Sequence, residues 1–211
     1  MRFIAALLCL AAAQSAGEVL LHPESSEFTR PAPAQSVVTL VTSKGEIDIE
    51  VHRDWAPRCA DRFYNLARLG YYTDIRFTRV VKERWAQFGI NGTPAIAKMW
   101  RAAEFANDPF IPEHSNVLGT VAFAFKDQKA LTTQVFINLQ DNHVTHDVEP
   151  FVPFGRIIRG VDVALALNTE YGDNAGGGIR GGKQDPLFEG GNAYIDRMYP
   201  KLDKIMDVKV R

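Results

Sequence analysis

Cysteine is scarce in this chain, and neither sign of charge is in excess. The 211 residues include two cysteines, and lysine plus arginine number 24 against 25 aspartate plus glutamate, for a formal net charge of −1. A chain without excess positive charge has little with which to displace counterions from a phosphate backbone. Nucleic acid is therefore not expected as a partner, and a peptide or a small molecule is the default ligand.

No apolar run in the sequence is long enough to cross a membrane as a helix, which takes about 20 residues. The longest one, from Phe3 to Ala13, has 11 residues. It follows the positive charge of Arg2 and precedes the small residues around Ala16. This layout is typical of a cleavable secretory signal peptide. We expect residues 1–16 to direct export to the periplasm, the outside medium or the secretory pathway.

Removal of the signal peptide would take Cys9 with it and leave Cys59 as the only thiol. A single thiol cannot form an internal disulfide, so the stability of the mature chain must come from its core. Cys59 recurs with apolar residues at helical spacing, which favours a small buried side chain over a nucleophile.

The chain divides into three parts by composition. Residues 17–36 mix Glu, Ser, Pro and Ala without periodicity, and we interpret them as a flexible leader. Residues 37–211 show no internal repeat and no second linker, and they are numerous enough to bury one sizeable core. They are expected to form a single domain with a C-terminal extension.

Strand signals dominate the domain. Residues 38–42 and 46–51 predict a hairpin, because the second run alternates strictly between apolar and polar residues. Asp54 is a candidate N-cap for a helix that has Pro57 in its first turn and ends at Gly70. Further strands are predicted at 75–81, 85–90, 119–125, 134–139, 152–158 and 204–210, and a short second helix at 160–167. Short strands without a βαβ rhythm indicate an antiparallel barrel or sandwich.

Several of these segments carry a family resemblance. The run Ile75-Arg76-Phe77-Thr78-Arg79-Val80-Val81 resembles the cyclophilin pattern Phe-x-Arg-Val/Ile-Val/Ile, and Gln87 follows at the expected distance. Four other blocks are similar to family blocks and stand in the same order: 56–66, 119–124, 133–139 and 153–160. The tail from Glu189 to Asp203 is similar to the extension of exported cyclophilins.

The resemblance covers roughly residues 37–170 and implies both a fold and an activity. The fold would be all-β dominated, a closed eight-stranded antiparallel β-barrel capped by two α-helices. The activity would be peptidyl-prolyl cis-trans isomerisation of proline-containing segments in client proteins, with no cofactor and no metal. We expect a monomer, and cyclosporin is a candidate ligand.

The chemistry of this reaction explains which residues matter. Rotation about a peptide bond meets a barrier of ~18–20 kcal/mol, and a donor aimed at the prolyl nitrogen can lower it by favouring the twisted amide. Arg79 is always charged and presents a rigid fork of donors. The resemblance identifies Arg79 and Gln87 as catalytic. Strand alternation would place Arg79 on one face with Phe77 and Val81.

Substrate-binding positions also follow from the resemblance. Phe136 is similar to the aromatic floor of the proline pocket, and it shares a strand face with Gln134, two residues earlier. Phe123 stands where relatives often carry Met or Phe. His146 lies near the position of a Trp or Phe that some cyclophilins use to bind cyclosporin.

The sequence also departs from the family pattern. Arg84 stands where the family usually has an aromatic residue, and the adjoining Trp85 is a candidate replacement for that wall. Phe151 stands where many members have a histidine. Residues 125–130 replace a common loop of small residues that borders the site for the residue before proline.

Three functions therefore remain open. The first is an isomerase that assists the folding of exported proteins, and the second is a proline-peptide-binding module with weak turnover on the same barrel. The third is a metal-dependent hydrolase built on His143 and His146, but a zinc site needs three or four converging ligands and the sequence shows no further cluster. Arg79, Gln87 and Phe136 favour the first.

Overall fold

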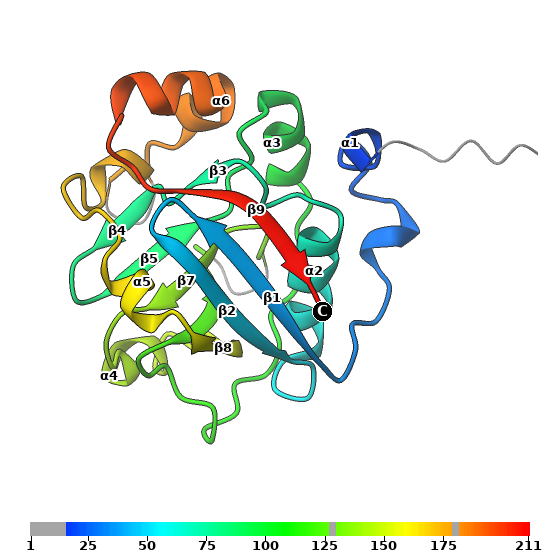
Figure 1. The fold of residues 1–211 in the computed structure, drawn as a ribbon. Coiled ribbons are helices and arrows are strands. Elements are labelled where there is room, and N and C mark those ends of the chain that lie inside the picture. Colours follow the sequence, from blue (N-terminus) through cyan, green and yellow to red (C-terminus); the bar gives the residue numbers. More distant parts are fainter. Residues whose placement is uncertain (1–15, 127–129, 179–181) are drawn as a thin grey trace, which may run out of the picture.

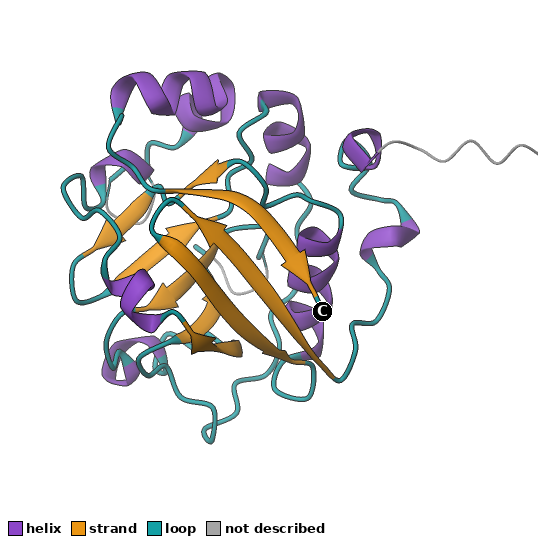
Figure 2. Ribbon diagram, in the orientation of Figure 1, coloured by secondary structure: helices purple, strands orange, loops and turns teal. Residues whose placement is uncertain are grey.

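A computed structural model describes residues 16–126, 130–178 and 182–211. One curled antiparallel sheet of nine strands forms the centre, in the order β3-β9-β1-β2-β8-β6-β7-β5-β4, and helices lie around it (Figure 1, Figure 2). The strands are β1 (Gln35–Thr42), β2 (Gly45–His52), β3 (Ile75–Arg76), β4 (Arg79–Val81), β5 (Trp85–Phe88), β6 (Thr120–Phe123), β7 (Val135–Asn138), β8 (Pro153–Arg159) and β9 (Lys204–Val210).

More helices are present than the two expected. The α-helices are α1 (Ala16–Val19), α2 (Pro57–Arg68), α3 (Pro94–Arg101), α4 (His143–His146), α5 (Val161–Leu165) and α6 (Asp185–Met198), and the 3₁₀ helices are η1 (Ser26–Phe28) and η2 (Asn174–Gly176). Within the described ranges, none of these helices has the length and apolar character needed to cross a membrane. The expected signal peptide lies outside the described residues, apart from Ala16.

The sheet is curled and differs from the predicted closed eight-stranded barrel. The run 75–81, expected as one strand, is divided into β3, which pairs with β9, and β4, which pairs with β5. The break has a physical cause: Phe77 turns into the core with no exposed surface, and its N–H donates to the carbonyl of Asp203 at 3.0 Å. The two edge strands are consecutive in the sequence, so Phe77 and Thr78 link the two edges of the sheet.

The β1–β2 hairpin confirms the predicted alternation. Ile47, Ile49 and Val51 are fully buried on the inner face of β2. Thr42 pairs with Gly45, which leaves a two-residue turn, and Gly45 has a φ of 137° that a side chain would strain. The hairpin forms the front of the sheet in Figure 1, with β1 lying between β2 and β9.

Helix α2 begins where Pro57 predicts, but its cap is not Asp54. The N-cap is Ala56, whose side chain makes no capping hydrogen bond. The carboxylate of Asp108, from a distant loop, supplies the missing acceptors. It accepts hydrogen bonds from the backbone N–H of Arg58 at 3.2 Å and from that of Cys59 at 2.9 Å. Cys59 is buried as predicted, and burial raises the pKa of its thiol well above the ordinary value.

The predicted flexible leader is instead packed against the domain, beside α2 and α3 (Figure 1). Phe28 is buried and meets Trp100 of α3 edge to face at 4.6 Å between ring centroids. The Trp100 indole N–H donates to the carbonyl of Leu20 at 2.7 Å, and Asn65 Nδ2 donates to the carbonyl of Arg30 at 2.7 Å. The polar composition of 17–36 hid these apolar anchors, so that prediction was wrong.

Helices α3 and α6 build a second, smaller core beside the sheet. Its buried members are Ile90, Ala97, Leu187, Phe188 and Ile195. The buried Arg76 ties α6 down, because its Nε donates to Asp196 Oδ1 at 2.8 Å. Consecutive glycines argue against a helix here, and Gly191 does interrupt α6 with a φ of 54°. That kink explains why the sequence did not predict α6.

Candidate active site

A cavity of about 590 Å³ lies along β4, β5 and the start of β7. Its other lining residues lie in the loops after β6 and around α4, on or just after α3, on α6, and in the turns before η2 and α6. The lining residues are Arg79, Arg84, Trp85, Gln87, Arg101, Glu104, Ala124, Phe125, Lys126, Ala130, Thr132, Gln134, Phe136, Thr145, His146, Glu149, Phe151, Asp173, Gln184 and Phe188. We call this cavity the groove.

One end of the groove is aromatic. The ring of Phe136 meets His146 edge to face at 5.2 Å and Phe151 edge to face at 5.3 Å. The ring centroid of Trp85 lies 5.6 Å from that of His146, and the ring centroid of Phe125 lies 4.4 Å from that of Phe151. These rings leave a concave apolar surface that can hold a small apolar ring away from water.

His146 contributes to this wall as a neutral ring. Its Nδ1 lies 3.1 Å from Asn138 Oδ1, an acceptor, so Nδ1 carries the hydrogen. Burial lowers the pKa of the imidazole, and nearby Arg84 adds to that effect, whereas Glu149 and Asp147 oppose it. The wall is therefore uncharged at neutral pH.

The polar side of the groove is a chain of hydrogen bonds that starts at Arg79. Arg79 Nη1 donates to Gln87 Oε1 at 2.7 Å, and Gln87 Nε2 donates to Gln134 Oε1 at 2.8 Å. Gln134 Nε2 lies 3.1 Å from Gln184 Oε1. On its other edge, Arg79 donates from Nε and Nη2 to Asp173 Oδ1 at 2.8 and 2.5 Å.

Strand register brings these groups together. Arg79 lies opposite Gln87 in the β4–β5 ladder, and Gln87 lies opposite Phe136 in the β5–β7 ladder. Three strands therefore present a donor, an amide and an aromatic ring side by side. The prediction that Phe77 shares the face of Arg79 was wrong, because the break before β4 sends Phe77 into the core, where it packs on Phe88 at 5.4 Å.

The structure places the predicted residues in the groove with one exception. Gln134 and Phe136 both line it, as their two-residue spacing predicted, and Trp85, Phe151 and His146 line the aromatic end. Phe123 does not line it: the side chain is buried between Phe105 and Phe154, at 5.1 and 5.3 Å. Alternation along β6 explains the difference, since Ala124, one residue later, lines the groove instead.

The contributions of Arg101, Asp173, Gln184 and Phe188 to the groove were not predicted from the sequence. Arg101 pairs with Asp185 at 2.7 Å, and its guanidinium lies 4.4 Å from the ring centroid of Phe188. Asp173 lies 94 residues after its partner Arg79 in the sequence, and Gln184 lies 50 residues after its partner Gln134. No local pattern around these positions signals such contacts.

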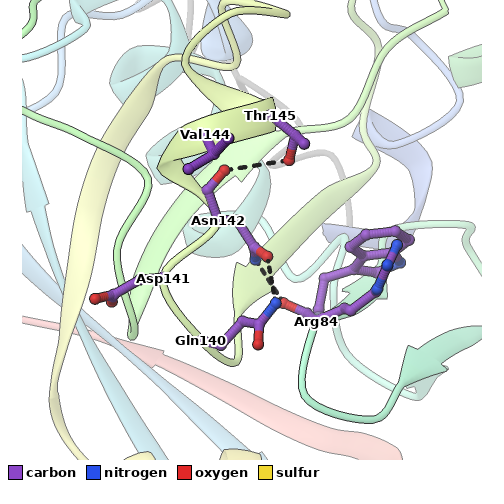
Figure 3. A pocket seen from close by; sticks show the side chains of 7 residues that line it. Arg84, Gln140, Asp141, Asn142, Val144 and Thr145 are labelled. Carbon is purple, nitrogen blue, oxygen red and sulfur yellow. Dashed lines mark hydrogen bonds between the residues drawn. The ribbon is translucent and has the colours of Figure 1, made fainter.

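A smaller pocket of about 170 Å³ adjoins the groove and shares Arg84, Trp85 and Thr145 with it (Figure 3). Asn142 organises this pocket by donating from Nδ2 to the carbonyl of Arg84 at 2.7 Å and accepting from Gln140 Nε2 at 3.1 Å. These bonds hold the turn that carries Trp85 into the aromatic wall.

In the described part of the chain, no three His, Cys, Asp or Glu side chains lie close enough together to hold a metal ion. His143 is exposed on α4, whereas His146 turns into the aromatic wall. The two histidines of the hydrolase hypothesis therefore do not face a common point.

Comparison with known proteins agrees with this geometry. The family model described as cyclophilin type peptidyl-prolyl cis-trans isomerase/CLD matches residues 37–184. The chain belongs to this cyclophilin family. A peptidyl-prolyl cis-trans isomerase of Arabidopsis thaliana is 28% identical over 146 residues, which cover 69% of this chain and 88% of that protein. A bacterial one from Acinetobacter baylyi is 31% identical over 140 residues, covering 63% and 71%.

Solved cyclophilin structures share the fold at low sequence identity. The crystal structure of a Cryptosporidium parvum cyclophilin matches with a TM-score of 0.59 and 18% identity, and covers 84% of this chain and 98% of that one. A second structure, of the same protein in the presence of the dipeptide Ala-Pro, matches with a TM-score of 0.57 at the same identity. At this identity the likeness establishes the fold alone.

Proposed function

We propose that the groove catalyses rotation about X-Pro peptide bonds, with Arg79 as the donor that stabilises the twisted amide. Peptidyl-prolyl isomerase activity accords with membership of the cyclophilin family. One observation carries the assignment of residues. Arg79 Nη1 donates to Gln87 Oε1 at 2.7 Å, and Gln87 lies on β5 directly opposite Phe136, which belongs to the aromatic wall.

The geometry suits a reaction that needs no bond cleavage. The proline ring would rest against Phe136, His146 and Phe151, and the aromatic end would keep water away from it. As the amide twists, the prolyl nitrogen loses conjugation and becomes a better acceptor. A donor placed there before the reaction stabilises the twisted state more than either planar one.

Arg79 has donors to spare for this role. A guanidinium carries five N–H groups, and the bonds to Asp173 and Gln87 use three of them. By this count, one N–H on Nη1 and one on Nη2 remain for a substrate. A thousandfold acceleration requires about 4 kcal/mol, much of which a charge-assisted hydrogen bond in a sheltered groove can supply.

We assign the groove to proline-containing segments of client proteins that are exported with this chain. The Ala-Pro dipeptide used with the Cryptosporidium parvum cyclophilin supports a proline ligand for the fold. The Arg2 charge and the apolar run Phe3–Ala13 support export. Cyclosporin is a second candidate ligand, with His146 at the wall it would contact.

Exchange spectroscopy on a short Ala-Pro peptide tests the catalytic proposal. Turnover in excess of the uncatalysed rate supports it, whereas binding without turnover would favour the peptide-binding module. Export is tested separately by mass spectrometry of the mature protein, which should begin near residue 16 or 17. Recovery of intact Met1 from a soluble cytoplasmic fraction would contradict export and would leave the catalytic proposal untouched.

A further inference from the structure

A segment between α5 and α6 reaches back onto Arg79. Asp173, just before η2, accepts from Nε and Nη2 of Arg79 at 2.8 and 2.5 Å through the same carboxylate oxygen, Oδ1. Both partners are sheltered, with side-chain exposures of 11% for Arg79 and 27% for Asp173. This pair is therefore better protected from screening than an exposed ion pair.

The backbone of the same segment also confines the aliphatic part of Arg79. Gly172 forms an isolated bridge with Val80, the residue after Arg79, so the segment is anchored to β4. A Cβ added at Gly176 would lie 1.9 Å from Arg79 Cγ. Only a glycine backbone can approach this closely, and the arginine stem cannot swing toward η2.

The glutamine chain returns to the same segment. Gln184, which precedes α6, donates from Nε2 to the carbonyl of Gly176 at 3.2 Å and exchanges hydrogen bonds with Gln134 at 3.1 and 3.2 Å. Starting from Arg79, the bonds through Gln87, Gln134 and Gln184 end on the turn that Asp173 precedes. The guanidinium is thus held at both edges by one closed set of contacts.

We infer that Asp173 is a positioning residue for Arg79, one that holds the guanidinium with its remaining two N–H groups toward the groove. This inference rests on the proposed catalytic role of Arg79. Catalysis by a hydrogen-bond donor depends on the donor being in place before the reaction, and small displacements are costly. In the described part of the chain, the side-chain hydrogen bonds of Asp173 go to Arg79 and none goes to a residue of the aromatic wall, so Asp173 should affect turnover more than peptide affinity.

Three variants test the inference in the full chain. Asp173→Ala should lower kcat about tenfold while the Kd for an Ala-Pro peptide stays within twofold. Asp173→Asn retains the side-chain oxygen that accepts from Arg79 and should recover most of the loss. Glu170→Ala is the matched control, because Glu170 lies in the same segment but pairs with the exposed Lys201 at 2.8 Å. It should behave as wild type.

A second measurement does not depend on turnover. In ¹⁵N NMR spectra the Arg79 Nε–H should be protected from solvent exchange in the wild type and Asp173→Asn, and exposed in Asp173→Ala. Unchanged or increased kcat in Asp173→Ala, or equal Nε–H protection in all three, would overturn the inference. Absence of wild-type turnover together with the expected NMR result would refute the catalytic proposal and leave the positioning contact established.

Discussion

Arg79 and Gln87 lie directly opposite each other in the β4–β5 ladder, and Nη1 of Arg79 donates to Oε1 of Gln87 at 2.7 Å. This bond fixes the orientation of both ends of Gln87, since Nε2 must then donate to Gln134. The arginine therefore orders the polar side of the groove in addition to its proposed role toward the substrate. Mutation of Arg79 should disturb both functions, which makes the choice of substitution important.

Replacement of Arg79 should cost far more turnover than affinity. Arg79→Ala should lose about 2–4 kcal/mol of transition-state stabilisation, roughly 30- to 900-fold in kcat, because one preorganised donor is removed. Arg79→Lys should not restore the rate, because a point charge cannot reproduce the planar fork. Exchange spectroscopy with a parallel peptide titration measures both quantities. Full turnover by a folded Arg79→Ala would refute the mechanism.

Replacement of Phe136 should weaken peptide binding and stability together. Phe136 is 4% exposed, and its ring contacts both His146 and Phe151. Phe136→Ala therefore removes pocket wall and buried surface, at a cost of about 3 kcal/mol in unfolding free energy. Phe123→Ala is the matched control, since Phe123 lies in the core. It should lower stability and leave the Kd unchanged. Equal peptide affinity in the wild type and Phe136→Ala would contradict the assignment.

Peptide binding should weaken in mild acid through His146. Burial lowers its pKa below 6.5, so the unfolded chain binds the proton more readily than the folded one. The stability contribution of the neutral ring is present above pH 6.5 and is lost as the pH falls toward the folded pKa. Protonation would also place a charge in the aromatic wall.

The control for this prediction is His146→Phe, which keeps an aromatic wall without a titrating group. Peptide Kd and melting temperature of both proteins should be measured between pH 5 and 8. The wild type should lose affinity and stability relative to His146→Phe at the acid end. Parallel pH profiles for the two proteins would show that another of the five histidines, or none, is responsible.

Asp48 should stabilise the outer face of the sheet above pH 4. Its carboxylate accepts from Arg159, Thr39 and Arg211, and the Arg159 bond is the main cause that lowers its pKa from 3.8 to about 2. Because the folded pKa is depressed, the contribution is present above pH 3.8 and is lost as the pH falls through 2.

The measurement is urea unfolding of the wild type and Asp48→Asn. At pH 7 the variant should be less stable by on the order of 1–2 kcal/mol, since one pKa unit corresponds to about 1.4 kcal/mol. Near pH 2 the difference should largely disappear. A difference that is independent of pH would mean that Asp48 acts through packing and not through its charge.

Local patterns predicted what depends on neighbours in the sequence. Alternation in 46–51 gave the buried face of β2, and the spacing of Gln134 and Phe136 gave a shared face on the groove. The contacts that the sequence did not predict join segments that are far apart along the chain. Asp108 caps α2 from about 50 residues away, and Asp173 meets Arg79 across 94 residues.

A second kind of error came from composition. The segment 17–36 is polar on average, yet Leu20 and Phe28 are enough to anchor it on Trp100. The glycines of α6 lower its intrinsic helix propensity, and burial of Phe188 and Ile195 compensates for that. In both cases tertiary packing outweighs the average composition of the segment. Composition alone does not show which few residues will be buried.

The position of β1 between β2 and β9 has a consequence for how the protein folds. Residues 38–42 pair with partners at 205–210, so one long edge of the hairpin stays open until residues more than 160 positions later in the sequence have been synthesised. Pairings between such distant segments are slow to form, and an open edge meanwhile offers its N–H and C=O groups to other chains. A chain that stops before residue 204 would keep the residues of the groove and lack the strand that covers β1, and it should aggregate instead of folding.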